Sequence, residues 1–139
     1  MEYRRFENTY IVRIDPQEEI LEQIKILAEK EEIKLASVQA LGAINAFTVG
    51  VFDPLEKKYY ANHFQGNYEI VSLTGTINTM NGDFYCHLHM SAGDDKGHVA
   101  GGHLNRAVVS ATCEMVIACI PGTVDRAFSE EVGLNLFKF

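Results

Sequence analysis

The sequence predicts an α+β protein with a mainly antiparallel β-sheet and one principal helix, folded as a compact single domain over residues 1–139. Three observations lead to this fold class. A single segment has the apolar period of a helix, several others have the alternation or apolar runs of strands, and short turns rather than crossover helices connect them. A chain of 139 residues without linker or low-complexity segment has the length of one ordinary domain.

The helix is predicted at about residues 16–31. Asp15 can cap it, Pro16 suits the first helical position, and Glu18 lies three residues after the cap. Apolar side chains then recur at helical spacing at Ile20, Leu21, Ile24 and Leu27. The opposite face is charged, which is typical of a helix with one side in solvent.

About eight strands are expected around this helix. One precedes it at residues 8–14, and a terminal tail that ends in apolar residues is expected to dock onto the domain. Turn signals such as Asn81-Gly82 and the segment 93–97 separate the strand-like stretches. These stretches are residues 34–44, 46–52, 58–64, 68–77, 84–92, 98–104 and 107–120.

Composition narrows the classes of function. The formal net charge is −7 and no run of basic residues exceeds two, which argues against a strong electrostatic grip on nucleic acid. No apolar stretch approaches the ~20 residues of a membrane span, and the start has no signal-peptide pattern. The odd set Cys86, Cys113 and Cys119 lies in apolar strand-like runs, which favours buried thiols and a cytoplasmic location.

Four of the five histidines lie within residues 86–104. His87 and His89 are two apart on a predicted strand, so both side chains point to one face with α-carbons ~6.5 Å apart. The following turn can bring His103 back toward this pair. Three neutral imidazoles with an open position form the ligand set of many catalytic zinc sites, although imidazole also binds iron, copper and nickel. The alternative is a polar strand face whose histidines only form hydrogen bonds.

The other two histidines are expected to be ordinary surface residues. His98 adjoins the turn, and His63 lies on a predicted surface strand. Glu69 is the candidate acid/base residue, because it lies on a strand face with Val71 and Leu73, where a carboxylate is unusual. That face belongs either to a pocket or interface or to a solvated edge. Glu114, between two apolar residues, is a weaker candidate.

Several segments together resemble the plants-and-prokaryotes conserved (PPC) domain family over about residues 5–138. These are ASVQALGAINAFTVGVFD, YEIVSLTGTI, GDFYCHLHMSAGDDKGHVAGGHL and ATCEMVIACI, and the histidine block is the most specific of them. The resemblance implies a compact α+β unit that forms a homotrimer. In plants the domain accompanies basic AT-hook motifs, hence the family's DNA-binding label, but this sequence has no AT-hook and no RGRP segment.

The family fold is also similar to that of acetolactate decarboxylase, a metalloenzyme with a His-x-His pair and a third histidine. His87, His89 and His103 match that set, whereas Glu69 has no counterpart that can be placed. The resemblance therefore implies a small trimeric metal-binding protein, most readily a zinc protein, acting as a metal-dependent lyase or hydrolase on a small oxygenated substrate such as a keto or hydroxy acid. The alternatives are a DNA-binding regulator and a non-catalytic self-association module.

Overall fold

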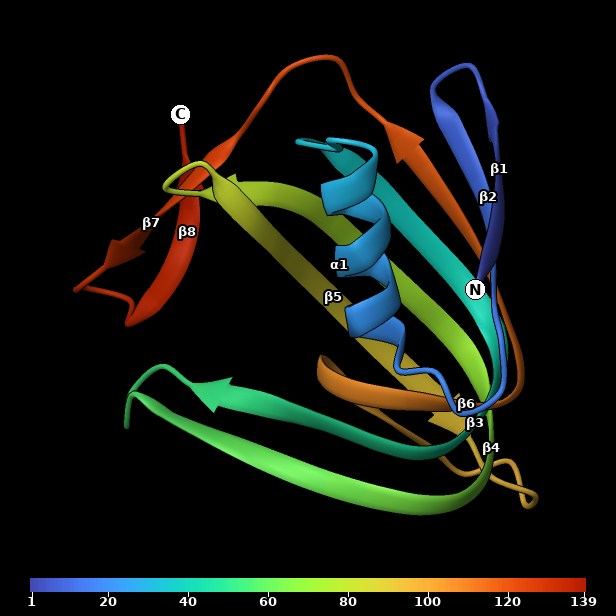
Figure 1. The fold of residues 1–139 in the computed structure, drawn as a ribbon. Helices are drawn as coiled ribbons and strands as arrows, with labels where there is room; N and C mark the ends of the chain where they lie inside the picture. Colours follow the sequence, from blue (N-terminus) through green and yellow to red (C-terminus); the bar gives the residue numbers. More distant parts are fainter.

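The computed structural model describes residues 1–139 and confirms an α+β fold dominated by antiparallel β-sheet. Eight strands and one α-helix follow one another along the chain (Figure 1). In chain order they are β1 (Glu2–Phe6), β2 (Thr9–Ile14), α1 (Ile20–Lys30), β3 (Ala36–Asp53), β4 (Lys58–Met80), β5 (Asp83–Gly93), β6 (Val99–Cys119), β7 (Asp125–Ser129) and β8 (Leu134–Lys138).

The main sheet closes on itself. Its strand order is β1-β2-β6-β3-β4-β5, and β5 also pairs with the beginning of β6. Strands β3, β4, β5 and β6 therefore form a ring, and the sheet curves around α1 (Figure 1). β3 pairs with β6 up to Gly50, and only the tips of β3 and β4, residues 51–53 and 58–60, continue beyond that pairing as a two-stranded ribbon. Closure pairs residues 89–93 of β5, which would otherwise be a free edge of the sheet.

Helix α1 covers the core from the inside of the curved sheet. Ile20, Ile24, Leu27 and Ala28 are buried, and they belong to one continuous cluster of 25 buried residues that includes side chains of β2 to β6. Their spacing places them on one helical face, as the sequence predicts. No helix of this structure has the length and apolar character needed to cross a membrane.

The helix begins at Ile20, so the prediction of a start at residue 16 is wrong by four residues. Glu19 is the N-cap, and its carboxylate accepts a hydrogen bond of 2.7 Å from the backbone N–H of Glu22. The preceding residues pair with β6 instead: Gln17 N–H donates to Val109 O, and Val109 N–H donates to Glu18 O. Gln17 has a φ of 72°, which is incompatible with a helix.

The strands are longer and less regular than the sequence suggests. Gly66 does not interrupt β4, and residues 98–104 and 107–120 belong to the single strand β6. The clean alternation expected over 68–77 fails, because a bulge between Ile70 and Ser72 leaves Val71 exposed while Ile70 and Leu73 are both buried. β1 is an addition to the predicted strands, and the C-terminal tail forms the hairpin β7–β8.

Candidate metal centre

Three histidines converge on the outer surface of the ring. His87 and His89 lie on β5, and the residues that alternate with them, Leu88 and Met90, are buried in the core. The two imidazoles therefore share the face that points away from the core, as period-two alternation predicts. His103 lies on β6 and is directly opposite His89 in the register of the two strands.

The short loop between β5 and β6 sets this register. Asp94 N–H donates to His98 O at 2.9 Å, and the Asp94 carboxylate accepts hydrogen bonds from the backbone N–H groups of Lys96 and His98. Gly97 has a φ of 79°, which closes the turn without strain. The loop thus fixes Gly93 opposite Val99, and the same register places His89 opposite His103.

Two glycines allow the strands to approach closely beside the histidines. A β-carbon on Gly75 of β4 would lie 2.0 Å from the backbone oxygen of His87. A β-carbon on Gly102, next to His103, would lie 2.5 Å from the backbone oxygen of Gly50 on β3. The glycine pair Gly101–Gly102 before His103 thus leaves room for this close approach.

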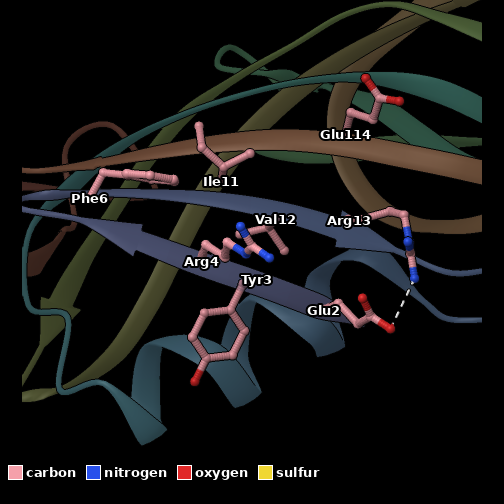
Figure 2. Close-up of a pocket in the computed structure, with 8 residues that line it drawn as sticks. All are labelled: Glu2, Tyr3, Arg4, Phe6, Ile11, Val12, Arg13 and Glu114. Atoms are coloured by element: carbon pink, nitrogen blue, oxygen red, sulfur yellow. Dashed lines mark ion pairs between the residues drawn. The ribbon is translucent and has the colours of Figure 1, made fainter.

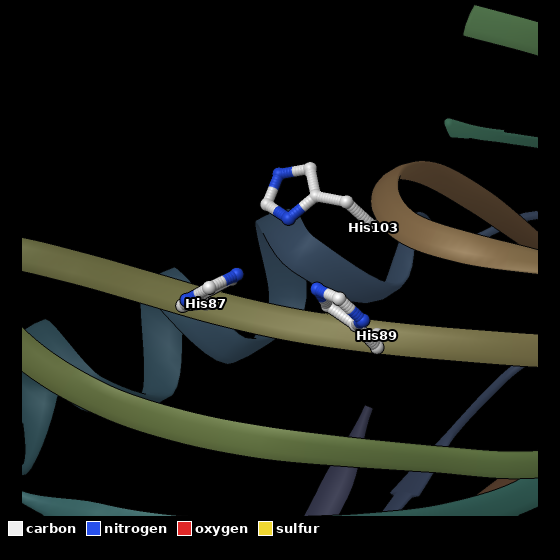
Figure 3. A group of neighbouring side chains, drawn as sticks. All are labelled: His87, His89 and His103. Carbon is white, nitrogen blue, oxygen red and sulfur yellow. The ribbon is translucent and has the colours of Figure 1, made fainter. Parts of the chain in front are cut away.

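The imidazoles are close enough to share one ion. One ring nitrogen from each histidine lies within 4.8 Å of the other two, and the ring centroids are 5.0–5.7 Å apart (Figure 3). A tetrahedral zinc ion with Zn–N bonds of ~2.0–2.1 Å requires nitrogens roughly 3.4 Å apart. Small side-chain rotations of about 1 Å would complete that geometry, so the residues fit a three-imidazole metal centre.

The surroundings of His87 and His103 keep both imidazoles neutral, which is the protonation state that binds a metal. Burial, with smaller contributions from His103, Arg126 and His89, lowers the pKa of His87 to about 4. Burial and the neighbouring His89 also lower the pKa of His103. Both rings are therefore neutral at pH 7 and retain a lone pair for a cation.

Arg126 of β7 is a neighbour of His87 that the sequence did not indicate. One of its terminal nitrogens lies 3.3 Å from Nδ1 of His87. Its Nε donates to Asn78 Oδ1 at 3.2 Å, and its other terminal nitrogen donates to Asn135 O at 2.7 Å. The guanidinium also stacks against Tyr85 and Phe137. No spacing signal could reveal this contact, since 39 residues separate Arg126 from His87.

Glu69 lies apart from the three histidines. It is exposed and stands opposite Gly93, whereas the β4 residue opposite His89 is Thr74. Five residues of strand separate Glu69 from Thr74, or roughly 16 Å along the strand. Glu69 instead lines a surface hollow of about 350 Å³ with acidic neighbours Asp94 and Asp95. Its role as an acid/base residue remains a prediction.

Glu114 lies on another face of the molecule. It borders a surface groove of about 420 Å³ formed mainly by β1 and β2, where Arg13 pairs with Glu2 at 3.2 Å (Figure 2). His63 and His98 are both exposed, as expected; they contact Thr48 and Asp94 respectively. None of these groups extends the histidine cluster.

Comparison with known proteins identifies the family. The model of the Plants and Prokaryotes Conserved (PCC) domain, the family abbreviated PPC above, matches residues 1–121. The chain belongs to this family. The matched region includes all three clustered histidines, whereas Arg126 and the β7–β8 hairpin lie beyond it. None of the functionally curated proteins matches this chain.

Solved structures share the PPC fold over nearly the whole chain. A Bacteroides thetaiotaomicron protein, provisionally named a DNA-binding protein, is 31% identical, with a TM-score of 0.96 and coverage of 99% of this chain and 96% of that one. A metal-containing protein from Archaeoglobus fulgidus is 30% identical, with a TM-score of 0.88 and coverage of 99% and 97%. A PPC protein from Pyrococcus horikoshii is 29% identical, with a TM-score of 0.86 and coverage of 99% and 94%.

Proposed function

We propose that this PPC protein binds a divalent transition metal, most readily zinc, through His87, His89 and His103. The observation that carries the proposal is the convergence of three ring nitrogens within 4.8 Å, with two of the rings held neutral by their surroundings. The similarity to the metal-containing Archaeoglobus fulgidus protein supports it. Zinc suits three imidazoles in a tetrahedral site.

Such a centre suits chemistry on a small oxygenated molecule. Three protein ligands leave one position for water or substrate, and a bound metal would polarise a carbonyl oxygen or lower the pKa of water. His89 is exposed, so this centre is reached from solvent. We therefore propose a lyase or hydrolase acting on a keto or hydroxy acid. If the three histidines instead held a purely structural ion, a closed fourth ligand would be required.

We also propose that the active form is a homotrimer, as the family resemblance implies. Exposed apolar side chains on the outer face of β2, β3 and β6 support self-association, among them Ile11, Leu41 and Val116. Within one chain, roughly 16 Å of strand separates Glu69 from the histidines. Glu69 can therefore be the proposed acid/base residue only in the assembled form. A second copy would have to bring Glu69 to the metal.

Metal content per chain tests the function directly. The protein is purified without a histidine tag or added metal and analysed by elemental mass spectrometry, and we expect close to one transition-metal ion per chain. The double variant His87→Ala/His89→Ala should lose the metal but keep its fold. The matched control His63→Ala/His98→Ala removes two exposed histidines and should retain it. Stoichiometric metal in the first variant would show that the ligands are wrongly assigned.

DNA binding is the second candidate, and the provisional names of the Bacteroides thetaiotaomicron and Ralstonia eutropha relatives favour it. The net charge of −7 per chain works against it, so binding would have to be local and steeply salt-dependent. A mobility-shift assay on an A·T-rich duplex at moderate salt separates the two functions. No shift at micromolar protein would exclude the DNA function for this chain.

A further inference from the structure

Arg126 is a buried cation without an anionic partner. Arg126 is only 6% exposed, and none of the ion pairs in the chain involves it. Its neighbour Asp125 accepts hydrogen bonds from Thr79 and Gly82 instead. Since a buried charge is normally paired, this guanidinium marks a place where a negative charge is missing.

The hydrogen-bonding capacity of Arg126 is only partly used. A guanidinium has five N–H donors and no acceptor. Asn78, Asn135 and His87 take one donor each, which leaves two without a partner in the chain. The aromatic rings of Tyr85 and Phe137 hold the group in place, at 4.9 and 4.2 Å from its central carbon. The guanidinium is therefore held beside His87 with two N–H donors unused.

Metal binding would remove the acceptor that His87 offers to Arg126. Nδ1 of His87 can accept from the guanidinium only while it carries no proton. If the metal binds Nε2, Nδ1 becomes an N–H donor; if the metal binds Nδ1, the lone pair is taken. In both cases a guanidinium donor loses its partner next to a divalent cation. A ligated histidine normally donates its second N–H to an acceptor, and an anion would supply one here.

We propose that the metal centre binds small carboxylates, with the carboxylate accepting hydrogen bonds from Arg126 while the ligand reaches the open metal position. This inference rests on the proposed function and adds the residue that recognises the carboxylate of its substrate. Arg126 would contact the ligand directly, and charge-assisted hydrogen bonds to a planar carboxylate are the interactions that guanidinium forms best. The competing role is structural, in which Arg126 only fastens the β7–β8 hairpin to β4 and β5.

Lactate and lactamide have the same size and differ in charge, so the pair first tests whether the site selects a carboxylate. The full chain is stripped of metal with a chelator and loaded with Co²⁺, whose visible absorption reports ligand binding. We expect lactate to shift the spectrum saturably, and to bind at least tenfold more tightly than lactamide, because a hydrogen bond to a charged group contributes about that factor. Equal affinity for the two ligands in the unaltered protein would overturn the proposal without any variant.

Variants at Arg126 assign the effect to this residue. Arg126→Gln should weaken lactate binding at least tenfold while leaving lactamide binding unchanged, because only the charge-assisted hydrogen bond to the carboxylate is lost. Arg126→Lys should keep part of the lactate affinity. Cobalt stoichiometry is measured first: less than one ion per chain overturns the metal assignment and this inference together. Full stoichiometry with no preference for lactate, or with lactate affinity unchanged in a folded Arg126→Gln variant, overturns this inference alone.

Discussion

The substitution Gly75→Ala tests how the strands hold the histidines. The added β-carbon would lie 2.0 Å from the backbone oxygen of His87 and 2.8 Å from the α-carbon of Leu88. Contacts of this kind are essentially never shorter than 3.0 Å, so β5 must move by at least about 1 Å at His87. Overpacking against backbone costs about 1–3 kcal/mol, which corresponds to a melting temperature lower by about 4–12 °C for a chain of this size.

The same displacement should weaken metal binding. A metal site tolerates deviations of about 0.2 Å in its ligand distances, and disturbing a ligand's support typically costs 10- to 100-fold in affinity. We expect at least a tenfold loss of zinc affinity in Gly75→Ala, measured by competition with a chromophoric chelator, together with the thermal shift measured on metal-free protein.

Gly93→Ala is the matched control. It adds the same methyl group, but on β5 rather than on β4. Its β-carbon would meet the side chains of Val71 and Val99 at 3.6 and 3.8 Å and the backbone oxygen of His98 at 3.9 Å, all of which are ordinary contacts. Stability should change by less than about 0.5 kcal/mol, and zinc affinity should stay within twofold. If Gly75→Ala behaved like this control in both measurements, the argument that close strand approach positions His87 would be refuted.

Three further predictions concern the core, the histidines and the thiols. Leu88→Ala should lower the free energy of unfolding of metal-free protein by about 2–5 kcal/mol in urea titrations, because Leu88 is only 1% exposed. Leu55 is 95% exposed, so the control Leu55→Ala should change this free energy by less than about 0.5 kcal/mol. In metal-free protein the His87 ring should titrate near pH 4 by NMR, and a midpoint near pH 6.5 would contradict this lowered pKa. Because the pKa lies below the value of 6.5 for the unfolded chain, the stabilising contribution of neutral His87 is complete above pH 6.5 and declines toward pH 4. Burial raises the pKa of Cys86 and Cys113 to about 12, so both thiols should resist Ellman's reagent at pH 8 in the native protein and react after unfolding in urea; rapid native reaction of either would contradict their burial.

Local sequence signals predict this site because one short loop controls it. His87 and His89 share a face by strand periodicity, and the turn at residues 94–98 places His89 opposite His103. Both relations depend on fewer than twenty consecutive residues. The single helix was likewise predictable from its apolar spacing, and so was the antiparallel sheet from its short connections.

Features that depend on distant partners could not be predicted in this way. The helix start is displaced because Gln17 and Glu18 pair with Val109, far along the chain. The bulge between Ile70 and Ser72 is a feature of the pairing of β4 with β5, which the pattern of residues 68–77 alone does not reveal. Arg126 reaches His87 through the packing of the β7–β8 hairpin against Asn78, and that packing has no local signature.

The histidines lie where the ring of strands closes, and this position explains why the site has one open side. β5 and β6 pair only from His89–His103 to Gly93–Val99, and the chain of β6 then continues along β3. His87 therefore extends beyond the last β5–β6 pair and has its strand partner, Thr76, only on β4. The guanidinium of Arg126 lies beside this unpaired part of β5, in contact with His87 and with Asn78 of β4.

The two parts of the site come from different regions of the chain. The three histidines belong to the region that matches the PPC model, residues 1–121, and the closed ring of strands fixes them. Arg126 comes from the hairpin that follows that region. A change in the hairpin can therefore alter the charge beside the histidines without replacing any of the three proposed ligands. Under our proposal, the shared ring provides the metal-binding site and the C-terminal hairpin determines which small molecules it accepts.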